Sequence, residues 1–181
     1  MSKPNSGLFV GTKGQRAKEP LPDDKKPSKS EIIANMQVEA NHWAEDEAQR
    51  LLDISKRQRD KFNTVCVVYD ELTERYYYGR NSGIKINNSI LNPIIFGSDD
   101  AKGLLPQRSL NNYELGNCAE VDAINNALNA GAKLANLHIM VLHSTTNNFG
   151  STKKSCENCT YAFKGIVKEN YSGWSEIKDG I

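Results

Sequence analysis

The run Thr64–Asp70 (TVCVVYD) constrains the fold most, because it is a nearly continuous stretch of apolar and β-branched residues. Such a run is typical of a buried strand. The short connection ELT joins it to a second run, residues 74–80 (ERYYYGR), so the two runs together predict a β-hairpin. We interpret Cys66, in the middle of the first strand, as a small buried hydrophobe.

A long amphipathic segment precedes this hairpin, at about residues 30–60. It begins at SKSE, residues 28–31, which matches a capping box at a helix start. Trp43 belongs to its apolar stripe and is expected to pack in the core. The residues that recur at helix spacing are Ile32, Ile33, Met36, Ala40, Trp43, Ala44, Ala48, Leu51 and Leu52.

Three further elements are predicted after the hairpin. They are a helix at Ala119–Ala130 with Gly131 as its C′ residue, a strand at Leu137–His143, and a helix that begins at Cys156. Residues 81–117 are expected to be irregular, with one short helix or strand, and a connection of that length often carries function. The order strand, strand, helix, strand, helix predicts an α/β sandwich with a mixed sheet.

Composition divides the chain into a tail and one domain. Residues 1–30 hold seven Lys/Arg and three acids among Pro, Gly and Ser, and are interpreted as a flexible linker. Residues 31–181 carry 16 basic and 19 acidic residues, a net charge of −3 that is not the overall footprint of a nucleic-acid binder. A nucleic-acid site would therefore be a local patch, or the substrate is small. No signal peptide and no apolar run of about 18 residues is visible, so no membrane partner is expected.

Three cysteines stand at predicted helix starts. Cys118 opens one helix, and Cys156 and Cys159 form a CxxC at the next. The amides of a helix N-terminus favour thiolates, so both helices could direct sulfur ligands at one zinc ion. Three protein ligands leave a fourth position for water, which is the arrangement of a catalytic zinc rather than a structural one.

Glu120 lies two residues after Cys118, in the same first helical turn. Its carboxylate could take a proton from a zinc-activated water, deliver it to a ring nitrogen and then to a departing amine. This chemistry is the hydrolytic deamination of an amidine-like carbon in a nucleobase.

The pattern CAE at one helix start and CxxC at the next resembles the zinc-dependent cytidine deaminase superfamily. The resemblance covers about residues 62–170 and implies that superfamily's three-layer sandwich, with a mixed central sheet and flanking helices. It implies that Cys118, Cys156 and Cys159 bind Zn²⁺ and that Glu120 moves protons. Ser155 stands where the family usually has proline.

The decamer NSGLFVGTKG, residues 5–14, resembles the junction that precedes toxin domains in bacterial polymorphic toxins. With the CAE and CxxC motifs it points to the YwqJ-like branch of deaminase toxins. The resemblance implies a domain that is secreted as part of a larger toxin and delivered into the cytoplasm of a target cell. It also implies a cognate immunity protein as partner.

Several alternatives stay open from the sequence. A fourth ligand from Cys66, His138 or His143 would close the site into a non-catalytic structural zinc module. Cys156 and Cys159 could instead be a redox pair, and an even number of cysteines allows disulfides. The substrate could be cytosine in DNA or RNA, a free cytidine or nucleotide, or adenine.

Substrate contacts are expected from local basic groups. Ser155, Lys153 and Lys154 adjoin the CxxC and are the first candidates. Tyr76, Tyr77 and Tyr78 could stack a base, although alternating strand tyrosines usually pack against a core. The upstream candidates for phosphate contacts are Arg75, Arg80, Lys85, Lys102 and Arg108.

Overall fold

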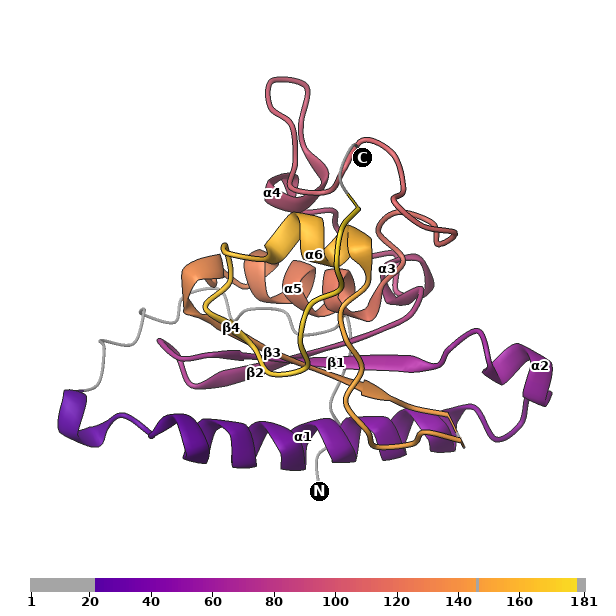
Figure 1. The fold of residues 1–181 in the computed structure, drawn as a ribbon, viewed down its shortest axis with the longest axis horizontal. Coiled ribbons are helices and arrows are strands. Elements are labelled where there is room, and N and C mark those ends of the chain that lie inside the picture. The colour runs from indigo at the N-terminus through magenta and orange to yellow at the C-terminus, as the bar shows by residue number, and fades with distance from the viewer. Residues whose placement is uncertain (1–21, 146, 179–181) are drawn as a thin grey trace.

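The computed structural model describes residues 22–145 and 147–178 and has a central sheet with helices on both faces (Figure 1). The strands are β1 (Thr64–Asp70), β2 (Arg75–Arg80), β3 (Leu137–His143) and β4 (Glu169–Asn170). Their order is β2-β1-β3-β4. The pairs β1–β2 and β1–β3 are antiparallel and β3–β4 is parallel. The predicted fold class, an α/β sandwich with a mixed sheet, is confirmed.

The register brings three strand ends together at one end of the sheet. Val65 pairs with Arg80 and Thr64 pairs with His143. The start of β1, the end of β2 and the end of β3 therefore lie side by side. This end of the sheet is called the Thr64 end below, and the pocket described in the next section opens there. The predicted hairpin and the predicted bounds of β1 and β3 are confirmed.

One face of the sheet is covered by the long helix α1 (Lys29–Arg50) (Figure 1). The helix begins as predicted, because the Ser28 hydroxyl accepts a hydrogen bond from the Glu31 amide at 3.2 Å. Trp43 is buried in its apolar stripe, which packs against inward-facing residues of the strands. This core comprises Ile32, Met36, Ala40, Trp43, Ala44, Val65, Val67, Tyr69, Met140 and Leu142.

The predicted helix over residues 30–60 is wrong beyond Arg50. The chain turns after Leu51, and Ser55 starts a separate one-turn helix, α2 (Lys56–Arg59), with a capping box to Gln58. A new cap within the segment is a second start signal, and it interrupts the apolar spacing. As a result α2 projects beyond the Thr64 end of the sheet (Figure 1).

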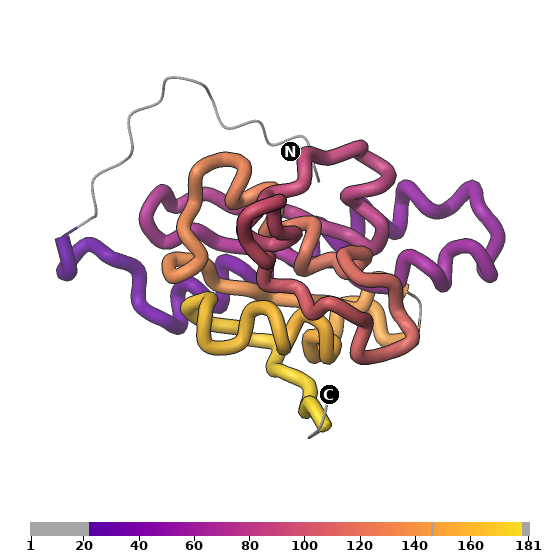
Figure 2. Tube along the Cα trace, turned by 90° about the horizontal axis from the view of Figure 1, so that it is seen from above, coloured from indigo at the N-terminus to yellow at the C-terminus, as the bar shows by residue number. Residues whose placement is uncertain are grey.

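The opposite face carries α5 (Ala119–Asn129) and α6 (Glu157–Phe163), which complete the three layers (Figures 1 and 2). Helix α5 matches its predicted bounds to within one residue, and Gly131 follows it at φ 94°, a backbone angle that glycine adopts without strain. Because α1 covers one face and α5 with α6 the other, Cys66 and Val68 of β1 face one core while Val65 and Val67 face the other.

Residues 81–117 contain two one-turn helices, α3 (Gly83–Ile86) and α4 (Pro93–Phe96), where one short element was expected. A 3₁₀ turn, Asp23–Lys25, precedes α1, and another, Leu134–Asn136, precedes β3. Most of the predicted linker, including residues 5–14, lies outside the described residues. Across the described ranges every helix is too short or too polar to traverse a lipid bilayer.

Candidate metal centre and its pocket

The starts of α5 and α6 meet at three cysteines. Cys118 is the N-cap residue of α5, Cys156 is the N-cap residue of α6, and Cys159 lies in the first turn of α6. Their ligand atoms all lie within 4.8 Å of one another, and the Cys118 and Cys156 sulfurs are 3.2 Å apart. All four cysteines of the chain are free thiols. The predicted convergence of three sulfurs is therefore present.

The three thiols share negative charge unequally. Hydrogen bonds from the Cys118 and Cys159 thiols hold the pKa of Cys156 well below its usual value, and the backbone amides of Cys159 and Asn158 act in the same direction. The hydrogen bond with Cys156 raises the pKa of the Cys118 thiol. Hydrogen bonds with Cys118 and Cys156 raise the pKa of the Cys159 thiol. A soft divalent cation would bind all three as thiolates and displace the remaining protons. The donor set is compatible with zinc.

Of the residues that could have closed the site, His143 lies at the Thr64 end of the sheet but is not part of the group of potential ligands. Within the described ranges, the cluster of potential metal ligands holds only the three cysteines. Cys66 is buried in β1. His138 lies near the other end of β3, where its ring nitrogens contact the Tyr171 hydroxyl at 2.8 Å and a Glu71 oxygen at 3.0 Å. The geometry thus favours an open site.

Glu120 is buried beside the cluster, with 3% of its surface exposed. Burial and the neighbouring Cys156 thiolate raise the pKa of its carboxyl group to about 7, although its own backbone amide, the Ser155 hydroxyl and Lys153 act in the opposite direction. A pKa near neutrality suits a group that accepts and then donates a proton.

A small pocket of about 70 Å³ opens onto Cys118, Cys156 and Glu120 at the Thr64 end of the sheet. One water needs roughly 10–15 Å³ of such space, so the pocket has room for several. Lys153 and Lys154, which are expected to contact substrate, are among its lining residues. The remaining lining residues are Asn63, Thr64, Asn81, Tyr113, Asn117 and Ala119.

The two lysines and Ser155 differ in position. Lys153 Nζ donates a hydrogen bond to Thr64 Oγ1 at 2.7 Å, so it is fixed at the pocket wall. The Ser155 side chain is fully buried and is not among the lining residues. Its hydroxyl accepts a hydrogen bond from Asn170 Nδ2 at 2.9 Å and acts on Glu120. Its placement supports a positioning role rather than contact with substrate.

Sequence reasoning named five of the eleven lining residues, and three of the six that it missed bear on ligand binding. Asn117 Oδ1 is buried without a hydrogen-bond partner in the described structure, which leaves an acceptor beside the cluster. Asn81 follows β2, and its Oδ1 accepts a hydrogen bond from the Thr64 amide at 2.7 Å. Tyr113 is 61% exposed at the mouth. The only sequence signal was the adjacency of Asn117 to Cys118.

The two residues inside the CxxC hold the segment that carries Tyr113. Asn158 Oδ1 accepts a hydrogen bond from the Leu110 amide at 2.8 Å, and its Nδ2 donates to Ser109 Oγ at 3.0 Å. Glu157 accepts a hydrogen bond from Asn111 Nδ2 at 2.8 Å. Hydrogen bonds therefore connect the CxxC turn to the segment that carries Tyr113.

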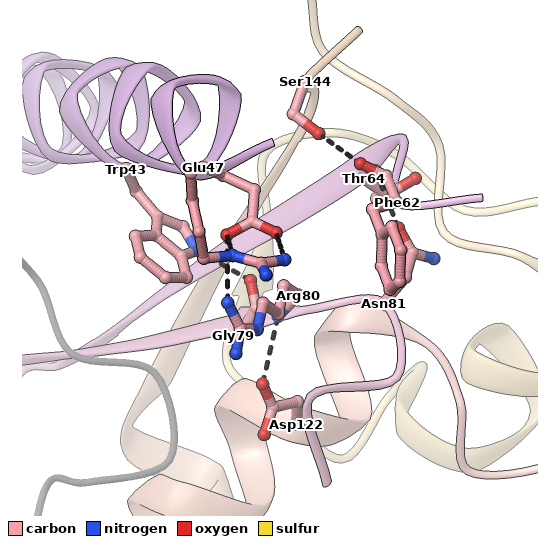
Figure 3. A network of polar contacts seen from close by, with 10 residues as sticks. Trp43, Glu47, Phe62, Thr64, Gly79, Arg80, Asn81, Asp122 and Ser144 are labelled. Atoms are coloured by element: carbon pink, nitrogen blue, oxygen red, sulfur yellow. Dashed lines mark hydrogen bonds and ion pairs between the residues drawn. The ribbon is translucent and has the colours of Figure 1, made fainter. Parts of the chain in front are cut away.

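Strand β2 fixes the start of α5 in place (Figure 3). A Cβ atom on Gly79 would lie 2.2 Å from the Ala119 carbonyl oxygen, so only glycine allows this approach. The Arg80 amide donates a hydrogen bond to Asp122 Oδ2 at 3.0 Å. From the other layer, Trp43 Nε1 donates to the Gly79 carbonyl at 2.7 Å.

The upstream basic candidates do not gather at the pocket. Arg80 is buried against Glu47, with Nη1 3.3 Å from a carboxylate oxygen, and Lys85 pairs with Glu114 at 2.6 Å. Arg75 lies at the opposite end of β2, paired with Asp70 in the register. Lys102 and Arg108 line a separate groove.

The three strand tyrosines pack against the two cores, as their alternation predicted. Tyr77 belongs to the core under α5, while Tyr76 and Tyr78 pack on the α1 side. Tyr78 also donates a hydrogen bond to Glu39 at 2.8 Å. Base stacking by this group is thus not supported.

Comparisons with models of protein families, with curated proteins and with solved structures found no match for this chain. The functional argument therefore depends on the residues and geometry of the pocket.

Proposed function

We propose that the protein is a zinc-dependent hydrolytic deaminase that acts on cytosine in nucleic acid. The observation that carries the proposal is the meeting of three thiols and a buried carboxyl group at one pocket. Cys118, Cys156 and Cys159 would hold the ion. When bound, zinc would lower the pKa of a water molecule to roughly 7 and so supply hydroxide near neutral pH.

Glu120 would carry the protons of the reaction. Water adds its oxygen to C4 of cytosine as the C4–N bond to the amino group breaks. One proton of the water ends on ring nitrogen N3 and the other leaves with the amine as ammonia, so cytosine and water become uracil and ammonia. A carboxyl group with a pKa of about 7 can accept and return both protons in turn.

The polar lining is consistent with a nitrogen heterocycle. The unpartnered Asn117 Oδ1 would accept a hydrogen bond from an N–H or O–H group of the ligand. Lys153 and Lys154 place positive charge at the rim, where a phosphate would lie. Adenine carries a similar amidine and remains a second candidate base.

Three alternatives can be distinguished from this proposal: a structural zinc module, a redox pair and a deaminase of free nucleosides or nucleotides. A structural zinc module would need a fourth ligand, and the cluster in the described residues has three. A redox pair formed by Cys156 and Cys159 leaves the adjacent Cys118 without a role. A free cytidine or nucleotide could also enter the pocket, and substrate comparison separates it from nucleic acid.

We further propose, from the resemblance of residues 5–14 and of the two cysteine motifs, that this domain is the toxic part of a larger secreted effector. An immunity protein would then block it in the producing cell. Expression with and without a candidate immunity gene, scored by survival and by mutations in cellular DNA and RNA, tests this part.

The central experiment replaces Glu120 with glutamine in the zinc-loaded protein. We expect zinc content and fold to persist while conversion of cytosine to uracil falls by at least about 100-fold, the scale of general acid–base catalysis. Single-stranded DNA, duplex DNA, RNA, cytidine and CMP are assayed in parallel.

Glu71→Gln is the matched control. Its carboxylate lies beyond the far end of β1, bonded to Lys168 at 2.6 Å, so its loss should leave turnover unchanged. Full activity of the Glu120→Gln protein would contradict the proposed proton transfer. Zinc without activity on any substrate would favour the structural module.

A further inference from the structure

A second cavity, of about 170 Å³, lies next to the metal pocket. The end of α1, helix α2 and the segment after β3 enclose it, and we call it the α2 cavity. Leu51, Leu52 and Phe149 give it apolar walls, and two cations and one acid border it, namely Lys56, Arg59 and Asp60. An apolar cavity edged by cations has the composition that a nucleotide requires, since a base has an apolar face and a phosphate is anionic.

The two cavities are lined by residues that are hydrogen-bonded to one another. Ser144 lines the α2 cavity and Asn63 lines the metal pocket. The Ser144 amide donates a hydrogen bond to the Asn63 carbonyl at 3.0 Å. The Ser144 hydroxyl donates to the Phe62 carbonyl at 3.0 Å (Figure 3). Asn63 lies four positions after Arg59 in the chain, a span of at most about 14 Å. At roughly 3.4 Å per nucleotide of a stacked strand, this is the length of a few nucleotides.

The segment 55–62 (SKRQRDKF) concentrates positive charge beside the α2 cavity. It holds Lys56, Arg57, Arg59 and Lys61 against the single acid Asp60, a net charge of +3. No ion pair joins any of the four to a carboxylate within the described residues, whereas Arg50, Arg80, Lys85 and Lys168 all have acidic partners. Arg59 Nε is buried beside the cavity and lacks a hydrogen-bond partner there.

We propose that the α2 cavity binds the base of a nucleotide that neighbours the substrate nucleotide in a single-stranded polynucleotide, while the cations of α2 contact the phosphates. The inference rests on the proposed function for the base in the metal pocket. It identifies the local basic patch that a domain of net charge −3 needs in order to hold a polyanion. An acidic protein would match the cations, but it would leave an apolar cavity beside a nucleobase pocket unexplained.

The test measures binding in the absence of turnover. Zinc-loaded Glu120→Gln protein is titrated into fluorescently labelled single-stranded DNA and RNA oligonucleotides that contain one cytosine, over a series of salt concentrations. The triple variant Lys56→Gln/Arg57→Gln/Lys61→Gln, in the same background, should lower the slope of log affinity against log salt by roughly 2, because each phosphate contact contributes about 0.7 for a single strand.

Phe149→Ala should weaken binding roughly tenfold, since loss of base stacking costs about that much, and should leave the salt slope unchanged. The side chain is 42% exposed, so the variant is expected to fold, and a melting curve verifies this. The matched control is Lys25→Gln/Lys133→Gln/Lys164→Gln. These three exposed lysines lie before α1 and at the ends of α5 and α6 away from the cysteines, and their loss should not change the slope.

Equal effects of the two triple variants, no effect of either, or no oligonucleotide binding by the parent protein would overturn the inference. The active protein gives an independent measurement. The α2 triple variant should raise KM for an oligonucleotide and leave conversion of free cytidine unchanged. If no substrate is deaminated but the α2 triple variant still lowers the slope of log affinity against log salt, the proposed binding surface is supported and the proposed deamination is contradicted. If only free cytidine is converted and oligonucleotides do not bind, the proposed deamination is supported and the proposed binding surface is contradicted.

Discussion

On one face of the sheet, α1 begins with a serine whose hydroxyl caps the helix, whereas on the other face α5 and α6 begin with cysteines that form no capping hydrogen bond through their side chains. Serine at an N-cap position is worth about 1 kcal/mol relative to an uncapped residue. The α5 and α6 side forgoes this stabilisation at both helix starts. In exchange, the amides of α6 face the Cys156 sulfur and favour its thiolate.

The two faces also differ in how their buried carboxyl groups are surrounded. On the α1 side, Glu47 is enclosed between Arg80 at 3.3 Å and Arg50 at 2.6 Å, so its charge is matched. On the α5 side, Glu120 is buried beside a thiolate, and its pKa is raised by that burial and that charge. One layer therefore pairs its buried carboxylate with two cations, while the other keeps a buried carboxyl group beside a thiolate. Three substitutions can break or sharpen this comparison.

The largest expected effect follows from Cys118→Ser. Loss of one of three sulfur ligands should reduce bound zinc from roughly one ion per chain to a small fraction after dialysis, and activity should fall with it. The control is Cys66→Ser, which replaces a buried thiol in β1 and should cost about 1–3 kcal/mol of stability without changing zinc content. Metal analysis and urea unfolding measure both quantities. Zinc retained by the Cys118→Ser protein would contradict the assignment of the centre.

Glu47→Gln should have an intermediate effect, on stability alone. It leaves Arg80, whose side chain is 10% exposed, without a carboxylate, which should cost about 3 kcal/mol. Arg50→Ala removes the other, 41% exposed, partner of the same carboxylate and should cost less than about 1 kcal/mol. Urea unfolding of the metal-loaded proteins gives the difference. A change in the zinc content of folded Glu47→Gln protein would show that the two layers are not separate in function.

Ser28→Ala should have the smallest effect, a loss of about 1 kcal/mol, because the Glu31 amide loses its acceptor. Ser28→Thr keeps the oxygen and should retain most of that stability. Both variants should have unaltered turnover, and thermal unfolding measures the change in stability. Equal stability of Ser28→Ala and the parent would mean that the cap contributes nothing to α1.

The strands and α5 could be predicted from sequence because their signals are local. Thr64–Asp70 and Leu137–His143 are apolar runs that match β1 and β3 at both ends. The three cysteines were predictable as a group because each stands at a recognisable helix start. The end of α1 was not, since Leu51 and Leu52 continue its apolar spacing after the helix has ended.

The missed features depend on contacts between distant residues. The burial of Arg80 is decided by Glu47, 33 residues earlier, and no local pattern reveals it. Asn81 and Tyr113 reach the pocket only because β2 and the segment held by Asn158 end at the same place. The two-residue strand β4 exists only through its pairing with His138 and Ile139.

The contacts of Gly79 limit how this protein can be altered by mutation. Its carbonyl bonds to α1 and its missing side chain admits α5, so the backbone of one residue links both outer layers. An alanine there would push α5 away from the strand and carry Cys118 and Glu120 with it. Stability and the placement of the cysteine cluster therefore cannot be changed independently at this position, whereas Ser28 and Glu47 allow stability to be adjusted alone.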